Sequence, residues 1–116
     1  MTEIDASTGY PYPSLPAAER VQCLHPDPAK TAPSVDKHLY EITRAAILDA
    51  VPARGEGLLA ASLRAEVEKR TPPVTWQHAS VGWYTIVVQL DLEARGLLQR
   101  AATEGPQRLY QRPLAR

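Results

Sequence analysis

The sequence predicts one small α+β domain, mostly helical, in which three helices precede a two-stranded hairpin. The chain has 116 residues, enough for one modest hydrophobic core. Apolar residues recur at spacings of three and four in three segments, residues 36–51, 60–70 and 80–95. After the third segment, two strand-like stretches flank Gly105-Pro106, a pair that favours a chain reversal.

The N-terminal part of the chain is rich in proline. Six of the eleven prolines lie in the first 33 residues, where each removes a backbone donor and biases its predecessor toward extended geometry. We therefore expect residues 1–35 to form a largely irregular arm, partly ordered against the domain from about residue 20. Residues 9–16 are typical of a polyproline-type stretch, which is either a ligand for an aromatic-lined groove or a loose leader.

The first helix is expected to begin near Ser34, a suitable N-cap, and to end before Pro52. Its apolar positions form one broad stripe, made of Leu39, Tyr40, Ile42, Ala46, Ile47, Leu48 and Val51. Gly55 and Gly57 then permit a reversal, and Leu58-Leu59 is long enough only for a brief extended segment.

The second and third helices are expected over residues 60–70 and from a Ser80 cap to about Arg95. Gly96 follows where a helix commonly ends in left-handed geometry. Residues 97–100 and 107–111 then form the hairpin.

This order of elements is that of a winged helix, a three-helix helix-turn-helix core with a C-terminal two-stranded wing. We expect the winged-helix domain to cover residues 36–112 and residues 113–116 to form a disordered tail.

A family resemblance agrees with this interpretation. The run from Asp91 to Leu98 resembles the end of the recognition helix entering the wing in many winged-helix proteins. Together with His25-Pro26-Asp27-Pro28, Val81-Gly82-Trp83-Tyr84 and Leu90–Gly96, it makes residues 21–111 resemble an uncharacterised family of small bacterial winged-helix proteins, a domain of unknown function. The resemblance implies the fold and brings no assigned activity, ligand or site residue.

The third helix is apolar on two sides rather than one. At 100° per residue, one apolar sector contains Val81, Tyr84, Val88 and Leu92, and a second contains Trp83, Ile86, Val87, Leu90 and Ala94. The polar strip consists of Gly82, Thr85, Gln89 and Glu93. If only one sector packs on the other helices, then the N-terminal arm, the loop around Trp76 or a second molecule must cover the other.

One functional hypothesis is a DNA-binding transcriptional regulator, by analogy with the fold alone. Residues 95–116 carry five arginines and one glutamate, a net charge of +4, which can attract phosphate. Thr85 and Gln89 would face a groove of double-stranded DNA, while the wing supplies a basic and aromatic stripe to the backbone, made of Arg100, Arg108, Tyr110 and Arg112. Tyr110 packing on the domain, with the arginines extended into water, is the structural alternative.

The competing hypothesis is a protein-interaction or homodimerisation module. Its interface would be the second apolar sector, with Trp83, Ile86, Val87 and Leu90 meeting a partner. The net charge of zero and the pI near 6.8 favour this hypothesis, because dedicated nucleic-acid domains are basic.

Other function classes find little support in the composition. No apolar run approaches the roughly 18 residues that cross a bilayer, so we expect no membrane association. The acidic start and the single cysteine predict a cytoplasmic protein. Cys23 and the three histidines lack zinc spacing, and no nucleophile or phosphate-loop motif occurs, so we expect no metal, no cofactor and no catalytic residues.

Overall fold

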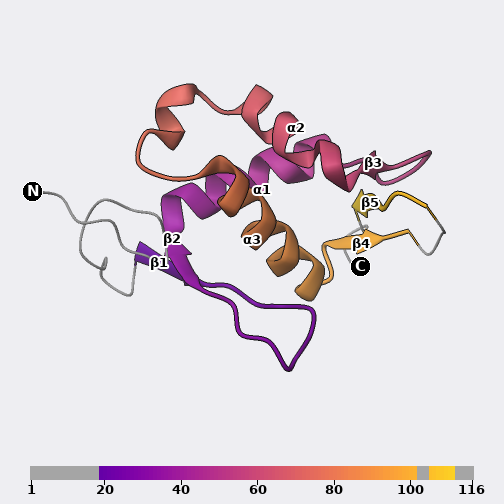
Figure 1. The fold of residues 1–116 in the computed structure, drawn as a ribbon, viewed down its shortest axis with the longest axis horizontal. Helices are drawn as coiled ribbons and strands as arrows, with labels where there is room; N and C mark the ends of the chain where they lie inside the picture. Colours follow the sequence, from indigo (N-terminus) through magenta and orange to yellow (C-terminus); the bar gives the residue numbers. More distant parts are fainter. Residues whose placement is uncertain (1–18, 102–104, 112–116) are drawn as a thin grey trace, which may run out of the picture.

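The computed structural model describes residues 19–101 and 105–111. Three α-helices lie between two small antiparallel sheets, so the fold is α+β, and about half of the described residues are helical. Figure 1 shows one sheet at each end of the helical layer, with the connection between the first two strands running along α3. Among the described helices, none is both long and apolar enough to cross a membrane. The predicted polyproline stretch and the C-terminal tail lie outside the described residues.

The first helix, α1 (Lys37–Ala50), buries one face against both other helices. Its N-cap is Asp36, whose carboxylate accepts a hydrogen bond from the Leu39 amide at 2.8 Å. The expected cap, Ser34, lies instead in a strand, because its backbone is committed to sheet pairing. The helix ends at Val51, ahead of Pro52, as expected.

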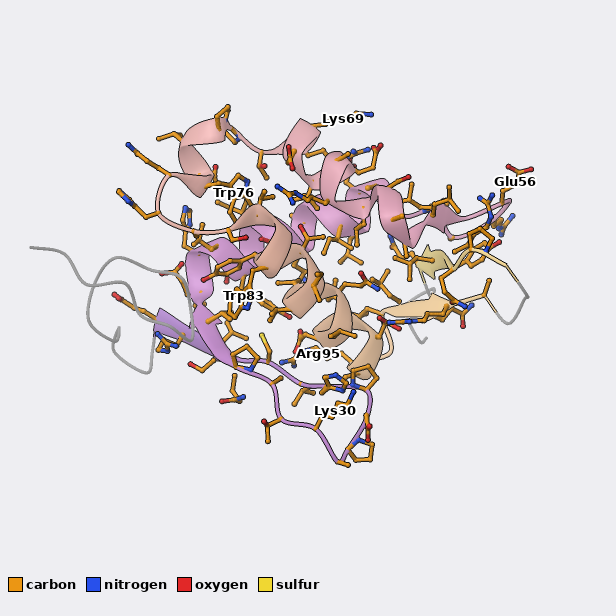
Figure 2. The ribbon with its side chains drawn as sticks, viewed as in Figure 1. Lys30, Glu56, Lys69, Trp76, Trp83 and Arg95 are labelled. Atoms are coloured by element: carbon orange, nitrogen blue, oxygen red, sulfur yellow. The ribbon has the colours of Figure 1, made fainter. Side chains whose placement is uncertain are left out.

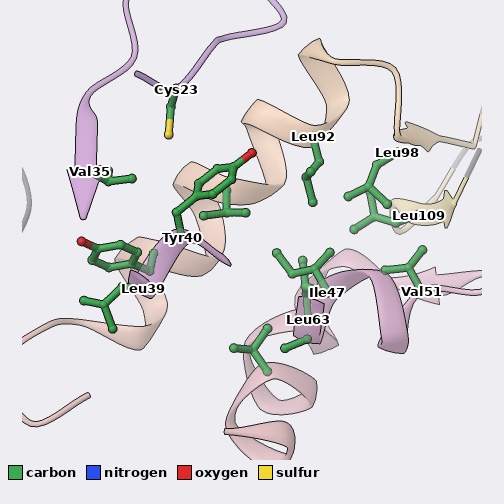
Figure 3. Packing of buried hydrophobic residues seen from close by; sticks show 14 residues of the cluster. Cys23, Val35, Leu39, Tyr40, Ile47, Val51, Leu63, Leu92, Leu98 and Leu109 are labelled. Atoms are coloured by element: carbon green, nitrogen blue, oxygen red, sulfur yellow. The ribbon is translucent and has the colours of Figure 1, made fainter. Parts of the chain in front are cut away.

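The helical layer is completed by α2 (Leu63–Arg70) and α3 (Val81–Ala94). Short 3₁₀ helices, Ala60–Ser62 and Pro73–Trp76, precede them. The expected Ser80 cap of α3 is confirmed, since its hydroxyl accepts from the Trp83 amide at 3.1 Å. The core fills the space between the helices (Figure 3), and its fully buried side chains include Val35, Ile47, Leu63, Val67, Tyr84, Val88, Leu92, Leu98 and Leu109.

Residues 20–36 form a β-hairpin in which β1 (Arg20–Gln22) pairs with β2 (Ser34–Asp36). The hairpin belongs to the folded unit, because Cys23 and Val35 are buried in the core. The compact domain therefore begins about 16 residues before the expected boundary at residue 36. Proline content concealed this hairpin, since its prolines lie in the connection and flank the strands rather than interrupting them.

The second sheet has three strands in the order β3-β5-β4. The expected C-terminal hairpin is present as β4 (Leu98–Arg100) and β5 (Arg108–Gln111), and the brief segment β3 (Leu58–Leu59) pairs with β5 on its other side. Side chains opposite one another share a face of a sheet. Leu109, paired with Leu58 and facing the core, therefore marks the inner face of this sheet.

Candidate functional site

The position of α3 explains why its sequence is apolar on two sides. One side packs against α1 and α2, and the neighbouring side meets the N-terminal hairpin. Trp83 and Val87 are half-buried and pack on the core, and the Trp83 ring lies edge-on to Tyr84 with centroids 5.2 Å apart. Trp83 and Val87, two of the five residues of the predicted second sector, are thus covered within one chain.

The outward face of α3 is apolar at its centre. Ile86 is 60% exposed, and Leu90, one turn later, is half-buried and lies outside the core cluster. The fourteen residues of α3 include no lysine or arginine. A helix that reads DNA bases needs donors and cations on this face, and here an isoleucine occupies its middle.

The two polar α3 residues assigned to a groove have other roles. Thr85 is only 3% exposed, and its hydroxyl donates to the Val81 carbonyl at 2.7 Å. This position removes Thr85 from the set of residues that can touch a base. Gln89 is half-buried, and its amide donates to Glu93 at 3.2 Å.

Arg100 lies on the inner face of the three-stranded sheet, because it pairs with Leu109 across the strands. It therefore does not join Arg108 and Tyr110, whose side chains belong to the outer face. Two nitrogens of its guanidinium donate to Glu93, Nε to Oε1 at 2.7 Å and Nη2 to Oε2 at 3.3 Å. This hydrogen bond raises the pKa of Arg100. The sequence could not predict this ion pair, because Glu93 lies on a helix and Arg100 on a strand, and their separation along the chain does not indicate a contact.

On the outer face of the same sheet, Arg108 and Tyr110 both bind the turn that precedes β3. Arg108 donates to the Glu56 carbonyl at 3.2 Å, and the Tyr110 hydroxyl donates to the Gly55 carbonyl at 3.0 Å. Both side chains are half-buried. The remaining residue of the predicted stripe, Arg112, lies outside the described residues.

An arginine that the sequence did not single out lies at the other end of the α3 face. Arg64, on α2, packs over Gly82: a Cβ at Gly82 would lie 3.2 Å from Arg64 Nη1. Arg64 also pairs with Glu68 at 2.9 Å, and its side chain is 65% exposed. The signal in the sequence was the glycine within a helix, which leaves room for a close neighbour.

Beside the hairpin, α3 carries a buried carboxylate, Asp91. It accepts hydrogen bonds from the Leu24 amide and from Arg95 Nε, each at 2.8 Å, and from the Tyr40 hydroxyl. Figure 2 shows Arg95 at the end of α3 that adjoins the hairpin connection. Burial and the hydrogen bond to Asp91 raise the pKa of Tyr40, and the same carboxylate raises the pKa of Arg95.

Cys23, His38 and His78 are further side chains of a reactive or metal-ligating type. Burial raises the pKa of the Cys23 thiol to about 12, and Asp91 adds to the effect, so Cys23 is a poor nucleophile at neutral pH. His38 and His78 line a cleft of about 300 Å³ beside the start of α1. In the part of the chain that the structure describes, no three histidine, cysteine or acidic side chains are grouped to hold a metal ion.

Comparison with known proteins identifies the family. A model described as "Family of unknown function (DUF6958)" matches residues 20–109, more than three quarters of the chain. The chain belongs to this family. Searches of curated proteins and of solved structures find no match.

The DUF6958 match begins and ends with the two sheets of the fold. The sequence motifs on which the family resemblance rested lie inside the matched range, and several of their residues have structural roles. Asp27 accepts from the Ala29 amide and so closes the turn of the hairpin, while Asp91 and Gly96 join α3 to the hairpin and to β4. In this DUF6958 chain Asp91 and Gly96 therefore hold elements together, and Asp27 shapes the connection of the hairpin.

Proposed function

We propose that this protein is a non-catalytic interaction module of the winged-helix type, which binds another protein through the outward face of α3. The winged-helix assignment is supported by the element order and by the strand order β3-β5-β4, in which the short strand after α1 pairs with the last strand of the wing. Fold alone does not select a ligand, so the function is argued from the surface of α3.

One observation carries the proposal: the helix that a DNA-binding winged helix inserts into the groove presents Ile86, 60% exposed, and carries no cation. Ile86 and the half-buried Leu90 one turn later form a contiguous apolar strip on an accessible helix face, and contiguous apolar surface is typical of a protein interface. The polar groups beside it, Gln89 and Glu93, are already bonded to one another.

A displayed library of random peptides of about 16 residues, long enough for roughly four helical turns, tests this proposal. We expect enriched peptides whose binding is lost in Ile86→Glu. Val74→Glu is the matched control, because Val74 is also an exposed apolar residue but lies in the Pro73–Trp76 helix. Enriched peptides that bind Ile86→Glu as well as the wild type, or no enrichment at all, would refute the proposal.

DNA binding is the second candidate, and one observation favours it: Arg108 and Tyr110 share the outer face of the wing. Direct measurement with mixed duplex DNA at about 50 and 200 mM salt separates the two candidates. We expect no binding at either concentration, since Thr85 is buried and α3 itself carries no lysine or arginine. Binding that weakens steeply with salt and is lost in Arg108→Ala would favour the DNA candidate instead.

A further inference from the structure

The outward face of α3 has an arginine at each end. At its start, Arg64 of α2 lies over Gly82. At its far end, Arg100 of β4 binds Glu93, three turns along the same face. Ile86 and Leu90 lie between them, one turn apart. The face is thus an apolar centre bounded by two guanidinium groups.

Both ends present an exposed guanidinium group to a partner, and each guanidinium is also paired with a glutamate of this chain. The Arg100 side chain is 48% exposed but that of Glu93 only 9%, so the guanidinium covers the carboxylate. At the other end, Arg64 is 65% exposed and is held by an ion pair on the surface of its own helix. Pairs of this exposed kind are weak, so a carboxylate from a partner can compete for Arg64.

We infer that the partner of this face is an amphipathic helix with an acidic residue at each end of its apolar stripe, an inference that rests on the proposed function. Gly82 and Glu93 are separated by about 16 Å along α3, from a rise of about 1.5 Å per residue. A partner helix that spans both arginines therefore carries its acids about 11 positions apart. Apolar side chains spaced by three and four residues between them meet Ile86 and Leu90.

A second copy of this chain fits the face poorly. In an antiparallel pairing about a two-fold axis, Arg64 of one copy meets Arg100 of the other, and in a parallel pairing each arginine meets itself. Exposed guanidinium groups meet at both ends in either case, which disfavours association. The charge at the ends therefore selects a different molecule with acidic ends.

Three synthetic peptides test the inference. They share one amphipathic helical stripe of leucines and differ only at the two end positions, which are glutamate, glutamine or lysine. Binding is measured by the anisotropy of the labelled peptide in low salt, where surface charges are least screened. We expect the glutamate peptide to bind about tenfold tighter than the lysine peptide, with the glutamine peptide between them.

Protein variants then assign the effect to residues. The double variant Arg64→Gln, Arg100→Gln is expected to abolish the difference in affinity between the peptides. The control is the double variant Arg44→Gln, Arg54→Gln, which makes the same change in net charge at exposed arginines elsewhere and is expected to preserve that difference. Ile86→Glu is expected to abolish binding of all three peptides. Circular dichroism verifies that each variant is folded.

Several results would overturn the inference. Equal binding of the three peptides, lost in Ile86→Glu, would reject the acidic partner and leave the interaction face standing. If none of the three peptides bound, while library peptides without acidic ends bound through Ile86, the acidic partner would also be rejected and the interaction face would also stand. Displacement of the glutamate peptide by duplex DNA would assign the arginines to phosphates, and self-association of the wild type that Ile86→Glu abolishes would assign the face to a second copy.

Discussion

Asp91 is the residue on which three separate parts of the chain converge. Its two carboxylate oxygens accept from the Leu24 amide in the hairpin, from Tyr40 in α1 and from Arg95 at the end of α3. A carboxylate with no exposed surface is costly to bury unless such donors surround it. Asp91 therefore determines how the hairpin, α1 and α3 are placed relative to one another.

Replacing Asp91→Ala should destabilise the fold strongly. The change leaves the buried Tyr40 hydroxyl and the Leu24 amide without their acceptor, and we expect a loss of about 3–5 kcal/mol in the free energy of unfolding, measured in urea. Asp49→Ala is the control, because Asp49 pairs with Arg70 but its side chain is 74% exposed; we expect about 0–1 kcal/mol there. Equal losses in the two variants would contradict the structural role of Asp91.

Buried groups with raised pKa values make stability sensitive to alkali. Burial raises the pKa of Cys23 from 9.0 to about 12 and also raises those of Tyr40 and Tyr84. The folded state holds these protons more tightly than the unfolded state, so stability is complete below about pH 9 and is lost as pH rises toward 12. Urea unfolding at about pH 8 and pH 11 measures this, and a free energy that stays constant would contradict the prediction.

Among the elements, the turn before β3 is constrained by two glycines with different surroundings. Both have positive φ, +80° at Gly55 and +71° at Gly57. A Cβ at Gly55 would meet nothing within 4 Å, whereas one at Gly57 would lie 2.8 Å from the Leu109 carbonyl oxygen and 2.9 Å from the Tyr110 ring. The three-stranded sheet therefore closes over Gly57.

The pair of alanine substitutions separates backbone strain from steric conflict. Gly55→Ala should cost about 1–2 kcal/mol in unfolding free energy, from the left-handed backbone alone. Gly57→Ala should cost more and should disturb the amide resonances of β3 and β5, because the new methyl group displaces the backbone of β5. Similar costs in the two variants would show that the sheet accommodates the methyl group.

Elements with local signals were predictable from sequence. The spacing of apolar residues located α1, α2 and α3, and Ser80 and Gly96 marked the limits of α3. The N-terminal hairpin was not predicted as strands, because each strand has three residues and its stability comes from contact with α3 rather than from propensity.

The candidate site was predictable only in part, for the same reason. The two apolar sectors of α3 and the central position of Ile86 follow from a helical projection. Contacts between elements do not: Arg100 reaches Glu93 from a strand, and Arg64 reaches Gly82 from another helix. Whether a given arginine is paired depends on these tertiary contacts, which the order of residues does not reveal.

For the whole molecule, the match to the family and the folded unit coincide. The family match begins at residue 20, where β1 begins, and ends at residue 109, within β5. The family match thus includes the N-terminal hairpin together with the helical core. Removal of the hairpin should expose Tyr84, whose hydroxyl accepts a hydrogen bond from the Asp36 amide. It should also expose the side of Asp91 that faces the hairpin.

Two shortened chains test this dependence. A chain that begins at residue 19 keeps the hairpin, and we expect it to unfold in one cooperative transition. A chain that begins at residue 37 lacks Cys23, Val35 and the α1 cap Asp36, and we expect no cooperative transition or a fall in Tm of more than about 10 °C, since each kcal/mol lost lowers Tm by about 4–8 °C in a domain of this size. Thermal unfolding followed by circular dichroism measures both. If the chain from residue 37 unfolded like the chain from residue 19, the three helices and the three-stranded sheet would form an independent core, and the N-terminal hairpin and its bonds to Asp91 would be dispensable for folding.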